Sequence, residues 1–280
     1  MIARNNILNQ ANKKPILFDF FFKENAIQKP IVVFCHGYKG FKDWGSWNLV
    51  ANAFMEANMF FVKFNFSHNG GTVSNPIDFP NLEAFAENNY TKELDDLDAV
   101  ISHLTAVDFK YKNEINTNNI IVIGHSRGGG ISIIKAGEDS RIKKLITWAS
   151  VCDFSKRTST IGDLENWRKT GVKYVLNGRT NQKMPHNFQF YEDFKANENR
   201  LNIKKAAKKI KIPFLIIHAK DDPSVKYNEA KALHLWNKNS ELISIKDSDH
   251  VFGAKQPWLY SYMPNALKIV VEKSILFIEK

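Results

Sequence analysis

Short apolar runs and amphipathic stretches alternate along most of the chain. Apolar runs typical of buried strands occupy residues 16–22, 31–35, 60–66, 120–123, 145–149, 214–218 and 242–245. Between them, apolar residues recur at helical spacing in residues 44–57, 90–104, 131–136, 228–236 and 264–278. Strands that alternate with helices in this way predict an α/β fold, with a mostly parallel central sheet and helices on both of its faces.

One long stretch interrupts the alternation. About sixty residues between the strands expected at 145–149 and 214–218 have no strand pattern and are rich in aromatic side chains. A structureless loop of this length is uncommon inside a compact domain. We therefore expect a helical cap over residues 153–205, called the cap segment below, inserted into a single domain that spans residues 1–280.

Composition and charge narrow the function classes. The chain is 44% apolar and 24% charged, which excludes disordered, collagen-like and disulfide-framework proteins. No apolar run approaches the ~18 residues of a membrane span, and residues 1–14 lack the apolar core of a signal peptide. We expect a soluble, cytoplasmic protein with no membrane partner, whose two cysteines, Cys35 and Cys152, are buried free thiols.

The net charge is +10, from 39 basic and 29 acidic residues. Such an excess indicates a nucleic-acid partner only where the charge is clustered. The densest run, KKAAKKIK at residues 204–211, places its lysines on one helical face, as expected for the exposed side of a surface helix. No nucleic-acid-binding motif accompanies it, so no nucleic-acid partner is expected.

The strongest motif is Gly124-His125-Ser126-Arg127-Gly128, which lies between an expected strand and an expected helix. A serine on such a sharp turn is held above the edge of the sheet, and glycines two residues before and after it let neighbouring backbone approach closely. The helix N-terminus behind the serine favours a developing negative charge. Ser126 is therefore the candidate nucleophile.

A glycine-bearing loop, His36-Gly37-Tyr38-Lys39-Gly40, directly follows the strand expected at residues 31–35. Loops at the carboxyl ends of parallel strands line the crevice where ligands bind. The backbone N–H groups of Tyr38 and Arg127 could together form an oxyanion hole. His36 precedes the loop, and we expect it to make a structural hydrogen bond to nearby backbone.

Two further strand ends carry the residue types that a serine nucleophile needs. His250 follows the strand expected at 242–245, and Asp222 follows the strand at 214–218, so the chain order is Ser126, Asp222, His250. Asp221 and Asp249 are the competing carboxylates, and we favour Asp222. Three other polar residues lie at the same edge: His68 either lines the pocket or is structural, and His125 and Arg127 belong to the scaffold or the rim.

With these motifs in this order, residues 15–280 resemble the α/β-hydrolase superfamily. The chain looks most like cinnamoyl or feruloyl esterases, and more distantly like dienelactone hydrolases and prolyl-oligopeptidase-type catalytic domains. The resemblance implies a cap after the sixth core strand, no cofactor and no metal. It assigns Ser126 as nucleophile, His250 as base, Asp222 as acid, and the amides of Tyr38 and Arg127 as oxyanion hole. One departure is His218-Ala219, where the family usually has His-Gly.

The expected activity is that of a serine carboxylesterase acting on small soluble esters through an acyl-enzyme. A peptidase or amidase with the same triad and a non-catalytic binding protein of the same fold stay open. The cap segment carries the aromatic residues Trp167, Tyr174, Phe188, Phe190 and Tyr191. Most of them are expected to form the cap's own small core, and some are expected to face the site. The sequence decides neither which ester is cleaved nor whether copies pair into a homodimer.

Overall fold

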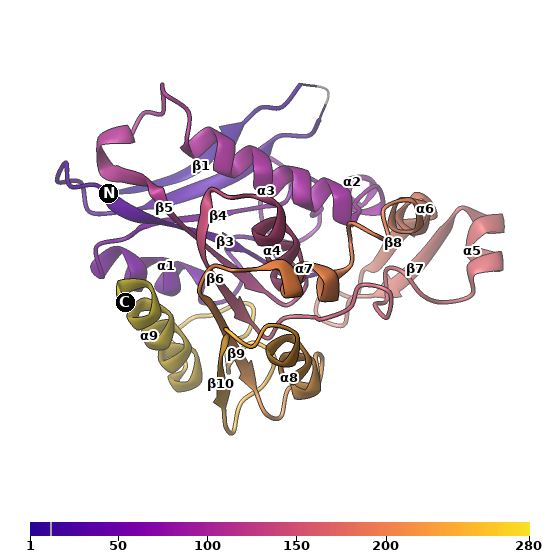
Figure 1. Cartoon of the computed structure of the whole chain (residues 1–280). Helices are drawn as coiled ribbons and strands as arrows, with labels where there is room; N and C mark the ends of the chain where they lie inside the picture. The colour runs from indigo at the N-terminus through magenta and orange to yellow at the C-terminus, as the bar shows by residue number, and fades with distance from the viewer. Residues whose placement is uncertain (12) are drawn as a thin grey trace.

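The computed structural model describes residues 1–11 and 13–280. Within them, eight strands form one sheet in the order β1-β2-β4-β3-β5-β6-β9-β10 (Figure 1). They are β1 (Ile2–Leu8), β2 (Ile16–Phe21), β4 (Phe60–Phe64), β3 (Lys29–Cys35), β5 (Ile115–His125), β6 (Ile142–Trp148), β9 (Phe214–Ala219) and β10 (Glu241–Ile245). All neighbours from β4 to β10 pair in parallel, whereas β1 and β4 each pair with β2 antiparallel. The mostly parallel sheet predicted from the sequence is confirmed.

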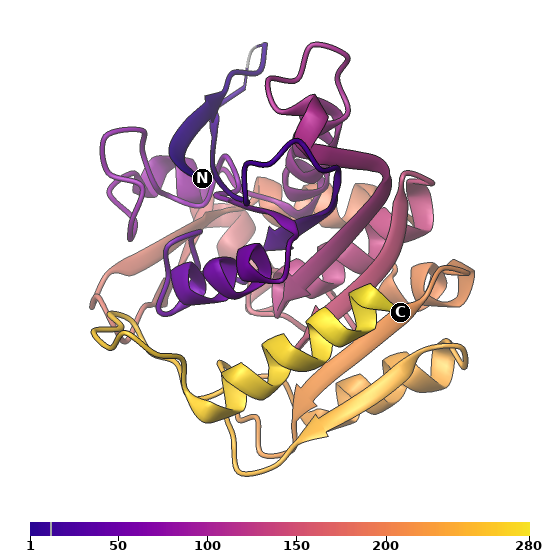
Figure 2. The same cartoon turned by 90° about the vertical axis from the view of Figure 1, so that its left-hand side faces the viewer.

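Helices cover both faces of this sheet. On one face lie α1 (Trp47–Glu56) and α9 (Asn265–Glu279), which Figure 2 shows in front of the strands. On the other face lie α3 (Tyr90–Leu104), α4 (Arg127–Glu138) and α8 (Tyr227–Trp236). Each of these five helices overlaps a segment in which helical spacing was found in the sequence.

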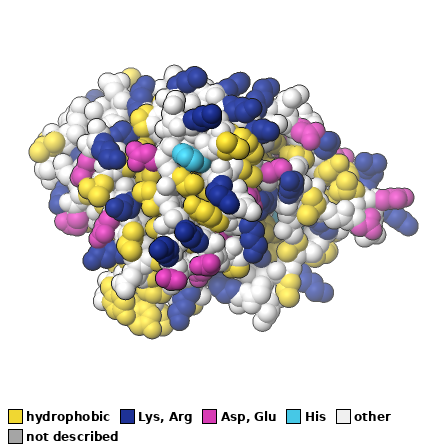
Figure 3. All heavy atoms as spheres, turned by 60° about the horizontal axis from the view of Figure 1, so that its bottom comes forward, with side chains coloured by type: hydrophobic (Ala, Val, Ile, Leu, Met, Phe, Trp, Pro, Cys, Tyr) yellow, Lys and Arg dark blue, Asp and Glu magenta, His cyan; other side chains and the backbone are white. Residues whose placement is uncertain are grey.

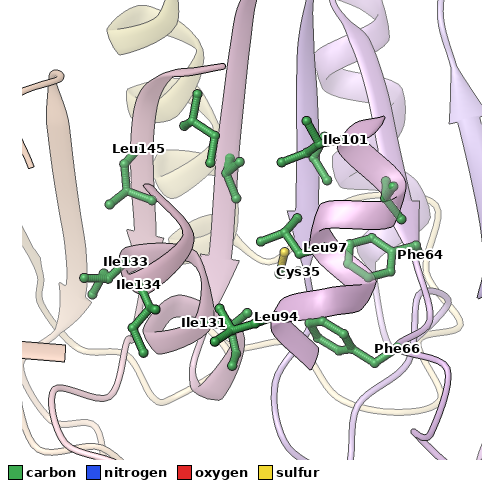
Figure 4. Close-up of a cluster of buried hydrophobic side chains, with 14 of the residues drawn as sticks. Cys35, Phe64, Phe66, Leu94, Leu97, Ile101, Ile131, Ile133, Ile134 and Leu145 are labelled. Carbon is green, nitrogen blue, oxygen red and sulfur yellow. The ribbon is translucent and has the colours of Figure 1, made fainter. Parts of the chain in front are cut away.

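The core is divided between the two faces because successive side chains of a strand point in opposite directions. In β3, Val33 and Cys35 belong to the cluster under α3 and α4, while Val32 and Phe34 belong to the cluster under α1 and α9. Figure 4 shows part of the first cluster, with Leu97 of α3 beside Cys35. Burial on both faces explains why the central strands are continuously apolar in sequence.

The cap segment follows β6, as expected, and projects from one side of the sheet (Figure 1). Its elements, with a last helix that runs past residue 205, are α5 (Leu164–Thr170), β7 (Val172–Leu176), β8 (Lys183–Asn187), α6 (Gln189–Ala196) and α7 (Ile203–Lys209). The antiparallel hairpin β7–β8 corrects the expectation that this stretch lacks strands. It escaped prediction because β7 is half-exposed and β8 contains Pro185, so neither gives an apolar run.

Three short or peripheral elements were also not predicted. The edge strand β1 carries Arg4, Asn5 and Asn6 among its apolar residues, and antiparallel pairing with β2 keeps it extended. The helix α2 (Leu82–Ala86) and the single 3₁₀ turn η1 (Lys112–Glu114) are too short to leave a periodic pattern.

The basic residues of the densest run lie on the exposed side of a helix. In α7 the four lysines Lys204, Lys205, Lys208 and Lys209 are exposed while Ala206 and Ala207 are buried, as the sequence predicted for a surface helix. On the face drawn in Figure 3, Lys and Arg side chains are scattered among hydrophobic ones. None of the described helices is both long and apolar enough to cross a membrane.

Both cysteines are free thiols. Cys35 is buried, as expected, whereas Cys152 is only half-buried.

We predict that Leu97→Ala lowers the free energy of unfolding by about 2–5 kcal/mol, because it leaves a cavity under α3. Leu97 is fully buried, whereas Leu235 of α8 is 68% exposed. The matched change Leu235→Ala should therefore alter stability by no more than about 0.5 kcal/mol. Urea unfolding monitored by circular dichroism measures both values, and equal losses would contradict this account of the core.

Candidate active site

Ser126 lies at the junction of β5 and α4 and has the left-handed backbone angles φ 56° and ψ −119°. Its N–H donates to the carbonyl of Trp148 (2.9 Å), and its own carbonyl accepts from Val151 (3.2 Å). A Cβ at Gly128 would lie 2.5 Å from the carbonyl oxygens of Cys35 and His36, closer than any side chain allows. The sharp strand-to-helix turn predicted from the glycine spacing is therefore present.

The three predicted triad residues are brought together by three separate strand ends. The Oγ of Ser126 lies 2.9 Å from Nε2 of His250, and Nδ1 of His250 lies 2.7 Å from Oδ2 of Asp222. His250 follows β10 and Asp222 follows β9. In this arrangement the serine hydroxyl can donate to the imidazole, while the imidazole donates its other proton to the carboxylate.

Asp222 is a buried carboxylate with several donors around it. Oδ1 accepts from the backbone N–H groups of Ser224 and Val225, both at 2.8 Å. Oδ2 lies 3.4 Å from Nε2 of His218 in addition to its bond with His250. Burial acts to raise the pKa of the Asp222 carboxyl, but the hydrogen bonds from His218 and His250 outweigh it and hold that pKa well below its usual range.

The competing carboxylates lie elsewhere. Asp221 is exposed and its side chain makes no contact with His250 within the described residues. Asp249 is also exposed, and Oδ1 accepts from the backbone N–H groups of Val251 and Gly253. Asp249 thus holds the turn that carries His250.

His125 is a structural neighbour of His250. Its Nε2 donates to the backbone carbonyl of His250 at 2.9 Å. Burial, reinforced by the adjacent His250, lowers the pKa of His125 to about 3, so this ring is neutral at pH 7. A neutral donor fixes the backbone of His250 without adding a charge next to its imidazole.

The loop that carries Tyr38 packs directly against the serine. A Cβ at Gly37 would lie 2.8 Å from Cβ of Ser126, so the loop can approach the serine this closely only with a glycine at position 37. Tyr38 lines the same cavity as Ser126 and Arg127. As expected, His36 is structural: Nδ1 donates to the Gly37 carbonyl (2.9 Å), and Nε2 accepts from the N–H of Phe66 (3.3 Å).

The side chain of Arg127 is a buried cation that sequence reasoning assigned only to scaffold or rim. Its guanidinium donates to Ser159 (2.9 Å), lies 3.3 Å from Glu93, and sits 4.3 Å from the centre of the Tyr38 ring. The rings of Tyr90 and Phe190 are 5.2 and 5.5 Å away. Apart from Tyr38, these partners come from α3 and the cap segment, and no motif in the sequence links them to Arg127.

A cavity of about 320 Å³ opens over Ser126 and His250. From the cap segment it is lined by Phe154, Arg157, Thr158 and Val175. None of the five candidate aromatic residues is among its lining residues: Trp167, Phe188 and Phe190 are buried within the protein, as expected for most of the five, and Tyr174 is exposed. The expectation that some of the five face the site is wrong, because packing of the cap segment against α2 and α3 uses the large rings.

His68 does not belong to this cavity. It lines a separate hollow with Lys13, Lys14 and Lys92, and its Nδ1 lies 2.7 Å from the Ser67 hydroxyl. Of the two alternatives considered for His68, the structural one is therefore favoured. Across the described chain, no three His, Cys, Asp or Glu side chains are grouped closely enough to hold a metal ion.

The depressed pKa of Asp222 predicts a pH-dependent contribution to stability. The contribution is fully present above the pKa of about 4 that the carboxyl has in the unfolded chain, and is lost as pH falls towards the folded pKa. Asp222→Asn should thus cost about 1–3 kcal/mol at pH 7, and the difference from the parent should narrow below about pH 4.

Unfolding free energies measured from pH 7 to pH 3 check this prediction, with the exposed Asp221→Asn as the matched control. Asp96, whose pKa burial raises to about 6, is present in every variant and cancels in the differences. A difference for Asp222→Asn that stays constant to pH 3 would contradict the shift.

Comparisons with known proteins show which family and which fold this chain shares. A family model described as BD-FAE matches residues 18–236. No curated protein matches the chain by sequence. Among solved structures, Est1E from Butyrivibrio proteoclasticus is 17% identical with a TM-score of 0.71, over 99% of this chain and 100% of that chain. Est1E with bound ferulic acid is 18% identical with a TM-score of 0.71, over 94% and 95% of the two chains.

A third structure, of a hydrolase from Agrobacterium vitis, is 15% identical with a TM-score of 0.72, over 99% of this chain and 98% of that chain. At such low identity these structures establish the shared α/β-hydrolase fold, and the family model establishes the relationship. The chain therefore belongs to the BD-FAE family, and it is a hydrolase of the esterase type.

Proposed function

We propose that this esterase cleaves carboxylic esters of small soluble molecules through an acyl-enzyme formed on Ser126. The observation that carries the proposal is the continuous hydrogen-bonded series Ser126–His250–Asp222, which opens onto a cavity. We further propose that residues 1–280 act as one domain and that the cap segment forms one side of its substrate pocket.

The first half of the reaction forms the acyl-enzyme. His250 accepts the proton of the Ser126 hydroxyl through Nε2 as Oγ attacks the ester carbonyl. Asp222, ionised and held by backbone donors, fixes the tautomer of the imidazole and stabilises its cation. The backbone N–H groups of Tyr38 and Arg127 are proposed to donate to the oxyanion, and His250 then protonates the leaving alcohol.

The second half reverses these roles with water. His250 takes a proton from a water molecule that attacks the acyl carbonyl, and the proton returns to Ser126 as the acid product leaves. Because the same groups serve both halves, no cofactor is required by the proposed reaction.

The cavity supports a compact substrate. Its volume of about 320 Å³ is near the lower end of the usual range for small-molecule sites. A similar structure, Est1E, is known with bound ferulic acid. Together these observations favour short-chain or hydroxycinnamoyl esters over lipids and polypeptides.

We predict that Ser126→Ala lowers kcat for an activated ester by about 10⁶, since the variant cannot form the acyl-enzyme. A fluorophosphonate probe should label the parent at Ser126 and leave the variant unlabelled. Ser155→Ala, a change at an exposed serine outside the cavity, is the matched control and should be labelled like the parent. Labelling that survives in Ser126→Ala would overturn the assignment.

We also predict that kcat/KM falls by about tenfold or more between p-nitrophenyl butyrate and p-nitrophenyl dodecanoate, because the cavity cannot enclose the longer chain. Methyl ferulate should be cleaved, and a peptide p-nitroanilide should be cleaved more slowly than the butyrate ester. Initial rates on this panel decide between the esterase and the peptidase with the same triad. Faster cleavage of the anilide would favour the peptidase.

A further inference from the structure

The cavity over Ser126 is lined by basic but not by acidic side chains. Lys39, Arg127 and Arg157 all line it, and within the described chain no Asp or Glu does. Asp222, the nearest candidate, is buried behind His250. The charged side chains that line the cavity are therefore three cations and no anion.

Two of these cations have carboxylate partners. Arg127 pairs with Glu93, and both side chains are buried. Arg157 pairs with Glu229 and also donates to the backbone carbonyl of Asp153. Their charges are therefore largely neutralised within the protein.

Lys39 differs from the two arginines. It is half-buried, and no carboxylate oxygen of the described residues lies within 4 Å of its Nζ. Its nearest polar contact is the backbone carbonyl of Leu176 at 3.5 Å, and its Nζ lies 5.2 Å from the centre of the Tyr38 ring. Lys39 is also the residue after Tyr38, so its charge is fixed close to the loop that packs on Ser126.

The charges of Arg127 and Lys39 act on a neighbouring histidine, His186. Burial first, and then the charges of Arg127, Lys173 and Lys39, lower the pKa of His186 to about 3. Lys39 is thus one of the cations whose charge acts in the region between the cap segment and the loop of residues 36–40.

We propose that the preferred esters of this enzyme carry a carboxylate, and that Lys39 is the specificity-determining residue that pairs with it. The inference rests on the proposed function of the same site. One unpaired cation suits one negative charge, whereas a phosphate group usually meets several cations or a row of backbone N–H donors. A carboxylate beside a half-buried ammonium is attracted more strongly than one in water, because fewer water molecules screen the pair.

The charge can sit on either side of the scissile bond, and two pairs of rigid probes distinguish the sides. On the acyl side, monomethyl terephthalate is compared with the neutral methyl 4-carbamoylbenzoate. On the alcohol side, 4-acetoxybenzoate is compared with the neutral 4-acetoxybenzamide. The para geometry prevents the carboxylate from attacking its own ester. Each kcat/KM is divided by the rate of hydroxide hydrolysis, which removes the difference in intrinsic reactivity.

For at least one pair, the parent should prefer the anionic ester, and Lys39→Gln should lower the anionic-to-neutral ratio about five- to tenfold. Lys39→Arg should retain the ratio, which separates charge from shape. Lys183→Gln, at an exposed lysine of β8 outside the cavity, is the matched control. Added NaCl should lower the ratio for the parent but not for Lys39→Gln.

Two results would overturn the inference while leaving the proposed function intact. One is a parent that cleaves the neutral member of both pairs faster. The other is an anionic-to-neutral ratio that Lys39→Gln leaves unchanged. If the parent cleaves no ester in the panel above, the proposed function fails, and this inference fails with it. Should Lys39→Gln fail to fold, as judged by circular dichroism, the salt dependence of the parent and the ratio for Lys39→Arg decide the question.

Discussion

Ser126 holds a left-handed backbone at the point where β5 passes into α4, and the surrounding chain is arranged around that turn. Such a conformation costs a non-glycine residue of the order of 1–3 kcal/mol, so it persists only where neighbours fix it. The fixing contacts are backbone hydrogen bonds to Trp148, the last residue of the adjoining strand β6, and from Val151, which lies just beyond it. On the other side of the turn, Gly128 lets α4 approach the carboxyl end of β3 closely. The packing of three strands thus determines where one hydroxyl lies.

The second requirement of the site is a charge held in place behind an imidazole. Asp222 keeps its charge in a buried position because backbone N–H groups and two histidines donate to it. The neighbouring His125 is neutral and bonds to backbone, so it adds rigidity without competing for the carboxylate. His125, His218 and His250 thus have different roles because their burial and their hydrogen bonds differ, although the residue type is the same.

The sequence was informative where burial is complete. Strand β9 and the second half of β5 are buried on both faces, so the strand ends that carry Asp222 and Ser126 could be placed from their apolar runs and motifs. His250 follows β10, which is only partly buried, and was placed by residue type and chain order. The edge strand β1 and the hairpin β7–β8 could not, because polar residues or a proline interrupt them and pairing partners supply their order. Arg127 contacts Glu93 and Ser159, which lie 34 and 32 residues away from it in the sequence, and only the folded chain brings them together. The aromatic residues of the cap segment could not be placed from the sequence either, because their spacing does not show whether their side chains face the cavity or the core.

Tyr38 joins two parts of the molecule that are far apart in sequence. Its backbone belongs to the loop beside Ser126, while its hydroxyl lies 2.7 Å from Nε2 of His186 on β8. Burial raises the pKa of Tyr38 to about 12, so the phenol keeps its proton and donates it to the neutral His186. A ligand too bulky for the cavity would press on Val175 of β7, which pairs with β8, and the Tyr38–His186 bond would then pull the loop away from the reacting carbonyl. Exclusion by size would therefore appear as slower turnover of the bound complex, and not only as weaker binding.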